Sequence, residues 1–452
     1  MIACSIIKKS QLENTRLDAE YYQPEYFIDF SKGNWRPLRD VVKTFQYGLS
    51  LVMNDEKIGY PMFKMDDIED GFLVDDTVRY TMVNDQEANP YLLQTGDVLF
   101  NRVNSIEFVG RTGIYKLDQK SVFASYLIRL QINDSQTLLP DYLDVFLNSS
   151  YGRKQINRCA RRAVNQANVN AEELKRMQIA LLPMNHQKMI ANFNESAWQG
   201  FMQAKLLYSQ AEDLLLEELG LKNFESEIKR ELWSIVNLSE TKRVNRIDAD
   251  YFQPKYQKLE SVIKKYKNQS LEKILENVPA KFDVMKEPNK LFKYVELSNI
   301  NASIGIIDGF SEMLGKEAPS RAKRVLKKDN VIVSSVEGSL GKVALVHKEH
   351  DGFLASTGFF QFRSEEILPE VLLILAKSIV FQWQLEKRCA GTILTAVPKE
   401  SINDILVPIL SQPIQQKIAD LVRKSHEARK KSKELLEEAK HKVEELIETS
   451  AK

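Results

Sequence analysis

The chain has 452 residues, which is more than one hydrophobic core usually holds and favours two or more domains. Hydrophobic residues make up 43% and charged residues 28% of it, a composition that excludes a disordered chain and does not indicate a membrane protein. Three cysteines exclude a disulfide framework and favour a cytoplasmic protein, while five scattered histidines without a Cys-x-x-Cys pair predict no bound metal. The formal net charge is only +1, so the basic residues would have to be clustered if the partner were nucleic acid.

An internal repeat is the most informative feature of the sequence. Residues 16–26 read Arg-Leu-Asp-Ala-Glu-Tyr-Tyr-Gln-Pro-Glu-Tyr, and residues 246–256 read Arg-Ile-Asp-Ala-Asp-Tyr-Phe-Gln-Pro-Lys-Tyr, so seven of eleven positions are identical at an offset of 230. Two shorter echoes keep the same order at nearly the same offset, namely 158–160 with 388–390 and 187–191 with 415–419. Self-similarity at a fixed spacing indicates a repeated architecture. The chain is therefore predicted to fold as two related halves.

Each half is predicted to begin with a domain of mixed helix and strand, over 1–183 and 221–410. Short apolar or alternating runs indicate strands, and a proline at the start of an apolar run indicates the first turn of a helix. The predicted strands include 97–101, 113–117, 126–132, 330–334 and 342–347, and the predicted helices are 140–147 and 369–379.

Each half is then predicted to end in a long helix, at 184–220 and at 411–452. Residues seven apart form a matching stripe of mostly small side chains in both: Ile190, Ala197, Ala204 and Ala211, then Ile418, Ser425, Ser432 and Ala439. A repeat of seven is typical of paired helices, and small residues let two backbones approach closely. The alternative is two separate amphipathic helices, each covering its own domain. We favour pairing of the two long helices. Together with the mixed domains, this predicts an α+β fold in which two duplicated domains are separated by two antiparallel coiled-coil helices and related by an approximate twofold axis.

The sequence contains no recognisable catalytic motif. Residues 338–343 contain glycine and lysine but lack the spacing of a phosphate-binding loop, which favours a strand and turn. Residues 89–91 read Asn-Pro-Tyr, part of a methyltransferase motif, but no glycine-rich cofactor loop precedes them. Cys159 and Cys389 lie at matched repeat positions, which indicates a shared packing role rather than a nucleophile. No catalytic residue and no cofactor is therefore predicted in this chain.

Basic residues cluster in both halves. Residues 151–170 contain five arginines and lysines and no acid, and residues 321–328 contain five more. Arginine, asparagine and glutamine are side chains that bind phosphates and base edges. A solvated basic face explains one such run equally well, but two runs on duplicated domains favour DNA. The predicted DNA contacts are Arg102, Arg111, Arg153, Lys154, Arg158, Arg161, Arg162, Asn165, Asn168, Lys323, Arg324, Ser335, Lys342, Arg388, Thr392 and Thr395.

The Leu-Asp-Ala-Glu-Tyr-Tyr-Gln-Pro opening, the basic loop and the proline-led start of each long helix, all present twice, resemble the specificity subunit of a type I restriction-modification system over the whole chain. The resemblance implies that each domain is a target recognition domain reading half of a split DNA sequence. It also implies that the helices form the spacer and dock two modification (methyltransferase) subunits. Double-stranded DNA and the restriction subunits, an ATP-dependent translocase and endonuclease, are the other implied partners. S-adenosylmethionine, ATP and Mg²⁺ would act through those partners and not in this chain.

Two other interpretations of the sequence belong to different classes. One is a self-contained DNA methyltransferase or nuclease, for which a glycine-rich cofactor loop would be expected, and none is visible. The other is a coiled-coil scaffold that does not bind DNA. Salt-dependent retention on duplex DNA separates this scaffold from a DNA-recognition subunit.

Overall fold

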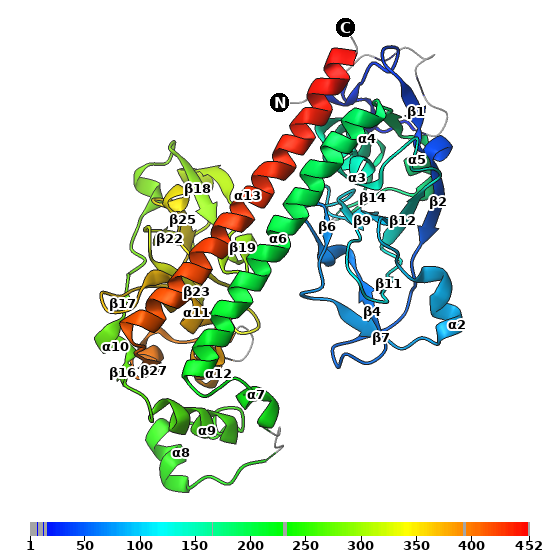
Figure 1. Ribbon diagram of the computed structural model, residues 1–452. Helices are drawn as coiled ribbons and strands as arrows, with labels where there is room; N and C mark the ends of the chain where they lie inside the picture. The colour runs from blue at the N-terminus through cyan, green and yellow to red at the C-terminus, as the bar shows by residue number, and fades with distance from the viewer. Residues whose placement is uncertain are drawn as a thin grey trace. The chain divides into compact units, whose positions relative to one another are not determined.

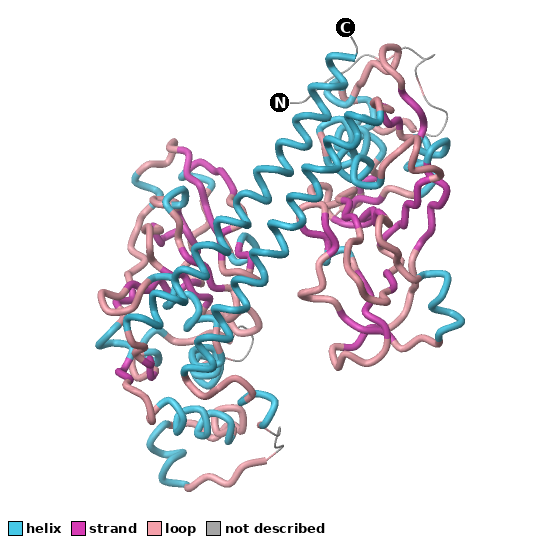
Figure 2. The backbone as a smooth tube through the Cα atoms, viewed as in Figure 1, coloured by secondary structure: helices cyan, strands magenta, loops and turns pink. Residues whose placement is uncertain are grey.

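The computed structural model describes residues 7, 12, 16–164, 166–228, 233–391 and 395–450, and the chain divides into two compact units (Figure 1). Unit 1 comprises residues 1–201 and 430–452, and unit 2 comprises residues 202–429. Both units mix helices with strands, which confirms the predicted α+β class (Figure 2). Within the described part of the chain, no helix combines the length and the apolar composition that crossing a membrane requires.

Unit 1 is built on a six-stranded sheet with the strand order β2-β12-β8-β10-β6-β5. The central strand β8 is buried along its whole length, because the neighbouring strands and helices cover it. A second sheet has the order β11-β4-β7-β3. The strands of unit 1 are β1 (Trp35–Pro37), β2 (Val42–Tyr47), β3 (Met53–Asn54), β4 (Tyr60–Phe63), β5 (Ile68–Glu69), β6 (Phe72–Leu73), β7 (Arg79–Thr81), β8 (Val98–Asn101), β9 (Val103–Asn104), β10 (Thr112–Ile114), β11 (Val122–Phe123), β12 (Leu127–Ile132), β13 (Arg161–Arg162), β14 (Ala167–Asn168) and β15 (Gln178–Ala180).

Helices α3 and α4 supply much of the core of unit 1. Pro140 occupies the first turn of α3, where its missing N–H would have no partner in any case. Tyr142, Phe146 and Ile156 on these helices pack with apolar residues of the sheet. The helices of unit 1 are α1 (Leu38–Val41), α2 (Asp85–Ala88), α3 (Pro140–Asn148), α4 (Ser150–Cys159) and α5 (Ala171–Arg176), together with parts of α6 (Met184–Glu218) and α13 (Gln412–Ser450).

Unit 2 repeats the six-stranded sheet strand for strand, in the order β17-β26-β23-β24-β20-β19. Its second sheet, β21-β18-β25-β22, differs because β22 pairs with β25, whereas in unit 1 the extra strand β3 pairs with β7. The strands of unit 2 are β16 (Asn268–Ser270), β17 (Glu276–Asn277), β18 (Leu291–Val295), β19 (Ile300–Asn301), β20 (Ile306–Ile307), β21 (Ser311–Leu314), β22 (Ala322–Val325), β23 (Val331–Ser334), β24 (Val343–Leu345), β25 (Leu354–Ser356), β26 (Phe359–Arg363) and β27 (Leu406–Pro408).

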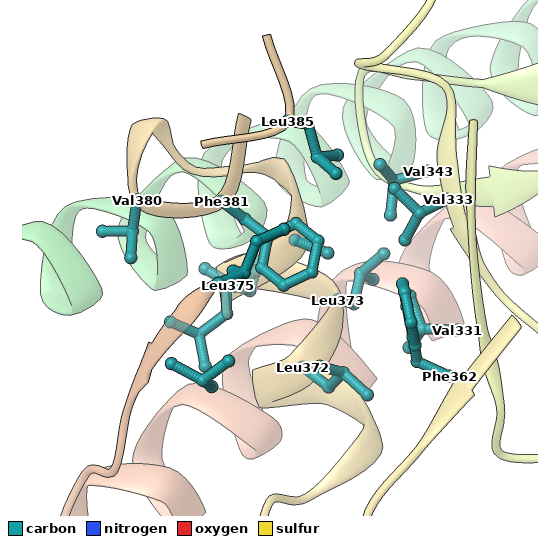
Figure 3. Packing of buried hydrophobic residues seen from close by; sticks show 14 of the residues in the cluster. Val331, Val333, Val343, Phe362, Leu372, Leu373, Leu375, Val380, Phe381 and Leu385 are labelled. Atoms are coloured by element: carbon teal, nitrogen blue, oxygen red, sulfur yellow. The ribbon is translucent and has the colours of Figure 1, made fainter. Parts of the chain in front are cut away.

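The core of unit 2 lies between this sheet and two helices. Figure 3 shows Leu372, Leu373 and Phe381 of these helices directed towards Val333 and Phe362 of the sheet. The helices of unit 2 are α7 (Phe224–Glu227), α8 (Leu238–Val244), α9 (Pro254–Ile263), α10 (Leu271–Ile274), α11 (Pro369–Lys377) and α12 (Ile379–Arg388), with the remaining parts of α6 and α13. Helices α11 and α12 follow the sheet as α3 and α4 do in unit 1, so the duplication extends to the core.

The long helices α6 and α13 pack against each other within each unit. In unit 1 the Ser432 hydroxyl donates to the carbonyl oxygen of Ala197 at 2.6 Å. In unit 2 the Ser425 hydroxyl donates to the carbonyl oxygen of Ala204 at 2.7 Å. A step of seven forward along α6 therefore matches a step of seven backward along α13, so the helices run antiparallel. These bonds between the helices rule out two separate helices. All eight residues of the heptad stripe are buried: Ile190, Ala197, Ala204, Ala211, Ile418, Ser425, Ser432 and Ala439.

A buried glutamine fixes the start of each long helix. In unit 1 the Gln187 side chain accepts from the Leu139 N–H at 3.0 Å and donates to the Leu182 carbonyl at 2.9 Å. Gln415 forms the matching bonds in unit 2, with the N–H of Leu368 and the carbonyl of Leu410. Each amide satisfies backbone groups that would otherwise be buried without partners. This explains why the third sequence echo falls at these positions.

Candidate nucleic-acid interface

A small three-stranded sheet in unit 1 carries part of the acid-free basic run. Strand β14 lies between β13 and β9, and its Asn168 pairs with Arg161 while Ala167 pairs with Asn104. Because side chains alternate along a strand, buried Ala167 faces the core and the next residue, Asn168, is exposed. Arg161 and Arg162 are exposed on the neighbouring strand. The β13–β14 hairpin thus presents two arginines and an asparagine to solvent.

Arg102, beside this hairpin, has a guanidinium held in one place. Its Nε donates to the Ser125 carbonyl at 2.9 Å, and its guanidinium carbon lies 5.0 Å from the centre of the Tyr47 ring. The backbone N–H of Arg102 donates to the Tyr126 carbonyl at 3.0 Å, and the Arg102 carbonyl accepts from the backbone N–H of Val169 at 2.9 Å. Among the described residues, no acceptor lies within hydrogen-bonding distance of its two Nη nitrogens. Those nitrogens are available for a group with two neighbouring acceptor atoms, such as a phosphate or a guanine edge.

Arg158, another predicted DNA contact, is engaged with the repeated opening motif. Its guanidinium lies 4.3 Å from the centre of the Tyr21 ring and 5.1 Å from that of Phe27. Buried Arg16 lies 4.5 Å from the Tyr21 ring centre and forms two hydrogen bonds with the Asp18 carboxylate, both 2.7 Å. These bonds hold the pKa of Asp18 below its ordinary value. Arg158 thus ties helix α4 to the opening motif.

The second copy of the opening motif is built in the same way. Arg246 pairs with Asp248 and lies 4.7 Å from the centre of the Tyr251 ring, and Lys387 lies 5.0 Å from that ring centre. Arg388, a predicted DNA contact, donates to the Asp404 carboxylate at 2.7 Å. Arg388 is therefore half-buried in an ion pair rather than standing free on a basic surface.

The other basic residues of unit 1 lie in different environments. Arg153 on α4 donates to the Val109 carbonyl at 2.7 Å, while Lys154 beside it is exposed. Arg111 is exposed, with its guanidinium 4.1 Å from the centre of the Phe108 ring. The helical turn of α4 therefore distributes the basic run over several directions.

Arg324 in unit 2 does not lie where the basic run predicts it. The sequence places it on a DNA-facing surface, but it is 1% exposed and donates to the Val278 carbonyl. Burial lowers the pKa of its guanidinium to about 10. The reason is the alternation of β22, in which Ala322 and Arg324 face inward while Lys323 between them is exposed. A phosphate cannot reach Arg324, so the assignment of this residue as a DNA contact is corrected.

The remaining predicted contacts of unit 2 lie near the end of β23. Lys342 donates from Nζ to the Ile300 carbonyl at 2.8 Å, and burial lowers its pKa. Ser335 donates to the Gly358 carbonyl at 2.9 Å, and Thr395 donates to the Glu337 carboxylate. The predicted contacts Asn165 and Thr392 lie outside the described residues.

The two matched cysteines are unsuited to nucleophilic chemistry. Both Cys159 and Cys389 are buried, and both are free thiols. Burial raises the pKa of the Cys159 thiol to about 12 and that of Cys389 to about 11. Both therefore remain protonated thiols at neutral pH, whereas the thiolate is the reactive form.

Several polar and aromatic residues of this region were not singled out in the sequence. Tyr47 is 40% and Tyr126 45% exposed, and both adjoin Arg102. Asn104 in unit 1 and Glu337 in unit 2 occupy the segments that directly follow β8 and β23. Aligning the two halves strand by strand would have drawn attention to them, because both follow matched strands of the duplicated sheet.

Comparison with known proteins gives related sequences over part of the chain. A putative type I restriction enzyme specificity subunit (MjaX) of Methanocaldococcus jannaschii is 31% identical over 182 residues, covering 38% of this chain and 42% of that protein. The type I restriction enzyme EcoKI specificity subunit of Escherichia coli is 27% identical over 172 residues, covering 37% of this chain and 36% of that protein. The aligned part is thus less than half the length of these relatives.

Among solved structures, the S subunit of a type I restriction-modification system from M. genitalium is similar over 95% of this chain and 99% of its own, at 15% identity and a TM-score of 0.43. No family model matches the chain. The sequence comparisons confirm the resemblance that the repeated opening motif predicts: the chain is related to the specificity subunits of type I restriction-modification systems.

Proposed function

We propose that the chain is a non-catalytic DNA-recognition subunit of a type I restriction-modification complex. Each unit binds one half of a bipartite target in double-stranded DNA. Two modification subunits dock on the chain and methylate the DNA with S-adenosylmethionine, and restriction subunits use ATP and Mg²⁺ to translocate and cut it. The chain itself supplies sequence recognition and assembly.

The observation that carries this proposal is the duplicated mixed domain in a chain whose relatives are specificity subunits. Two supports come from the chemistry of the residues. The β13–β14 hairpin and Arg102 present side chains that bind phosphates and base edges, and the two matched cysteines are buried thiols. A coiled-coil scaffold without DNA is the second candidate, and the paired helices α6 and α13 are the observation in its favour.

Selection from a random duplex library tests the proposal. The full chain, alone and with its modification partner, is incubated with duplexes of random sequence, and the bound fraction is sequenced. We expect a split sequence, with two specified parts separated by an unspecified spacer. Retention without any selected sequence would contradict sequence recognition, and no retention at low salt would favour the scaffold. Mapping methylated adenines in the host genome provides an independent reading of the same target.

Replacing Arg161 and Arg162 with alanine is expected to weaken DNA binding by the full chain. Each phosphate contact that is lost should reduce the slope of log affinity against log salt by about one. Fluorescence anisotropy with a labelled duplex at several salt concentrations measures this slope. The matched control replaces Arg36 and Arg39, which are exposed on β1 and α1 and change the net charge equally. An equal loss in both variants would show that only net charge matters, and would contradict a role for the hairpin.

The purified chain alone is expected to transfer no methyl group and to cut no DNA. The reason is that its sequence contains no cofactor loop and no nuclease motif. Incubation with tritiated S-adenosylmethionine and duplex DNA, with and without the modification partner, measures the transfer. Label incorporated by the chain alone, at a level that scales with its concentration, would establish the methyltransferase interpretation instead.

A further inference from the structure

The two units share a backbone frame at the end of the central strand of each main sheet. In unit 1 the N–H of Arg102 donates to the Tyr126 carbonyl at 3.0 Å, and the N–H of Val169 donates to the Arg102 carbonyl at 2.9 Å. In unit 2 the N–H of Ser335 donates to the Gly358 carbonyl at 2.8 Å, and the N–H of Val397 donates to the Ser335 carbonyl at 2.8 Å. The two hydrogen bonds of unit 1 thus recur in unit 2, which matches Arg102 with Ser335 and Tyr126 with Gly358.

Strand pairing extends the match. Val103 pairs with Asn168 in unit 1, and Val336 pairs with Ala396 in unit 2. The residues after the two valines, Asn104 and Glu337, are therefore also equivalent. The frame thus consists of four matched pairs of positions: 102 with 335, 104 with 337, 126 with 358, and 168 with 396.

The two units carry the same residues where the frame packs against the core. They carry different residues at the four matched pairs of positions. Val103 matches Val336, and Val169 matches Val397, with both Val169 and Val397 buried. The four frame positions carry arginine, asparagine, tyrosine and asparagine in unit 1, but serine, glutamate, glycine and alanine in unit 2. The same backbone therefore presents a different set of hydrogen-bonding groups in each unit.

We propose that these frame positions determine the base specificity of each half-site, an inference that rests on the proposed function. Arg102 reads a guanine in the half-site bound by unit 1. Glu337 reads a cytosine in the half-site bound by unit 2. The two half-sites differ because the frame is kept and its side chains are changed.

Arg102 suits guanine because its guanidinium is held before any DNA is bound. The Ser125 carbonyl and the Tyr47 ring fix its plane, and its Nη nitrogens meet no acceptor among the described residues. Guanine presents O6 and N7 side by side in the major groove, where two parallel N–H donors can reach both. A side chain fixed in advance loses less conformational entropy on binding. Asn168, exposed on the adjacent strand β14, presents an amide that can pair in the same way with adenine.

Glu337 suits a base edge rather than the DNA backbone. Its carboxylate is exposed and accepts a hydrogen bond from the Thr395 hydroxyl, which orients it. A carboxylate is repelled by phosphates, so a glutamate that faces DNA gains only from a donor in the groove. The cytosine N4 amino group is such a donor.

Variants of these two residues in the same library selection test the inference. Arg102→Ala in the full chain is expected to lose a preference for guanine at one position of one half-site, with the other half-site unchanged. The loss should be about 5- to 150-fold, the range for one bidentate base contact. Glu337→Gln is expected to relax a single cytosine position in the other half-site. Arg102→Lys keeps the charge and can still donate to guanine, but it lacks the two fixed parallel donors, so it should weaken the same guanine preference less than Arg102→Ala does.

Each outcome separates this inference from the proposed function. If the wild-type chain selects no sequence, the proposed function fails. If the wild-type chain selects a split sequence and Arg102→Ala lowers binding to all sequences equally, Arg102 contacts phosphate and the inference is wrong. An unchanged selection in Arg102→Ala and Glu337→Gln, with circular dichroism and melting temperature like those of the wild type, overturns the inference as well. Arg36→Ala, which removes an exposed charge on β1, serves as the control that should leave the selected sequence intact.

Discussion

Replacing Ala197 with leucine is expected to lower the free energy of unfolding of unit 1 by about 1–3 kcal/mol, the usual cost of overfilling a packed site. Ala197 is fully buried, and its carbonyl accepts the hydrogen bond of Ser432 across the helix pair. Three added carbon atoms cannot fit while the two backbones remain that close. The helices must therefore separate or shift, which also weakens the Ser432 bond. Urea unfolding of the full chain, followed by circular dichroism, measures the change.

The neighbouring residue provides a control for this substitution. Ser196 is exposed on the same turn of α6, so Ser196→Leu adds similar volume outside the helix pair and should change the stability little. Ser432→Ala removes the hydroxyl without adding volume, and should cost about 1 kcal/mol. Equal stabilities of the Ala197→Leu and Ser196→Leu variants would show that the small-residue layer is not required for close pairing.

Two buried groups, His426 in unit 2 and Asp144 in unit 1, are expected to contribute to the pH dependence of stability in opposite directions. In unit 2, burial lowers the pKa of His426 to about 4, so the unfolded chain binds the proton more readily and stability falls as the pH drops below 6.5. The loss should reach about 2 kcal/mol at pH 5 relative to pH 8. In unit 1, burial raises the pKa of Asp144 to about 7, so the folded state binds the proton more readily. Stability then falls as the pH rises from 4 to 7, by about 3 kcal/mol.

The groups around each residue account for these directions. The Nδ1 of His426 lies 3.0 Å from the Nε2 of His347, and its Nε2 donates to the Ile304 carbonyl at 2.8 Å. The Tyr208 ring stacks beside His426, and the Lys377 ammonium, which pairs with the Glu212 carboxylate at 3.4 Å, lies over that ring. Burial, together with the neighbouring His347 and Lys377, disfavours an added proton on His426. Asp144 is buried, and this burial raises its pKa more than the hydrogen bond from the Thr112 hydroxyl at 2.7 Å lowers it.

Hydrogen–deuterium exchange of the full chain, read separately for peptides of each unit and corrected for the intrinsic rate, measures both pH dependences. The matched variants His426→Gln and Asp144→Asn keep polar groups that do not titrate in this range, so each should flatten the pH dependence of its own unit. A pH dependence that is the same in each variant as in the wild type would contradict the assignment.

The helix pair could be predicted from the sequence because its determinant is local. Residues seven apart lie on one stripe of a helix, and small side chains in that stripe require a close partner. Equal spacing in the two halves then fixed the register that the Ser432–Ala197 and Ser425–Ala204 hydrogen bonds show. The repeated opening motif could be read for the same reason, since identity at a fixed offset needs no knowledge of the fold.

The candidate interface could be predicted only in part, because it depends on contacts between distant segments. Arg102 lies next to the β13–β14 hairpin through the pairing of β9 with β14, which joins residues more than 60 positions apart. A run of basic residues in the sequence also does not show which side chains face solvent and which face the core. Strand β22 turns Arg324 inward, and the turn of α4 takes Arg158 to Tyr21. Charge counts along the sequence therefore overestimated the basic surface.

The antiparallel helix pair has a consequence for the synthesis of the protein. Ser432, which closes the helix pair in unit 1, follows Ala197 by 235 residues. At about 5–20 residues per second, a ribosome needs roughly 10–50 s to make that interval. During this time the face of α6 that carries Ile190, Ala197 and Phe201 has no α13 to cover it, while the domain that precedes it is already complete in sequence. Nascent chains on one messenger carry the same uncovered stripe, so this interval is when copies of the protein are most exposed to pairing with one another.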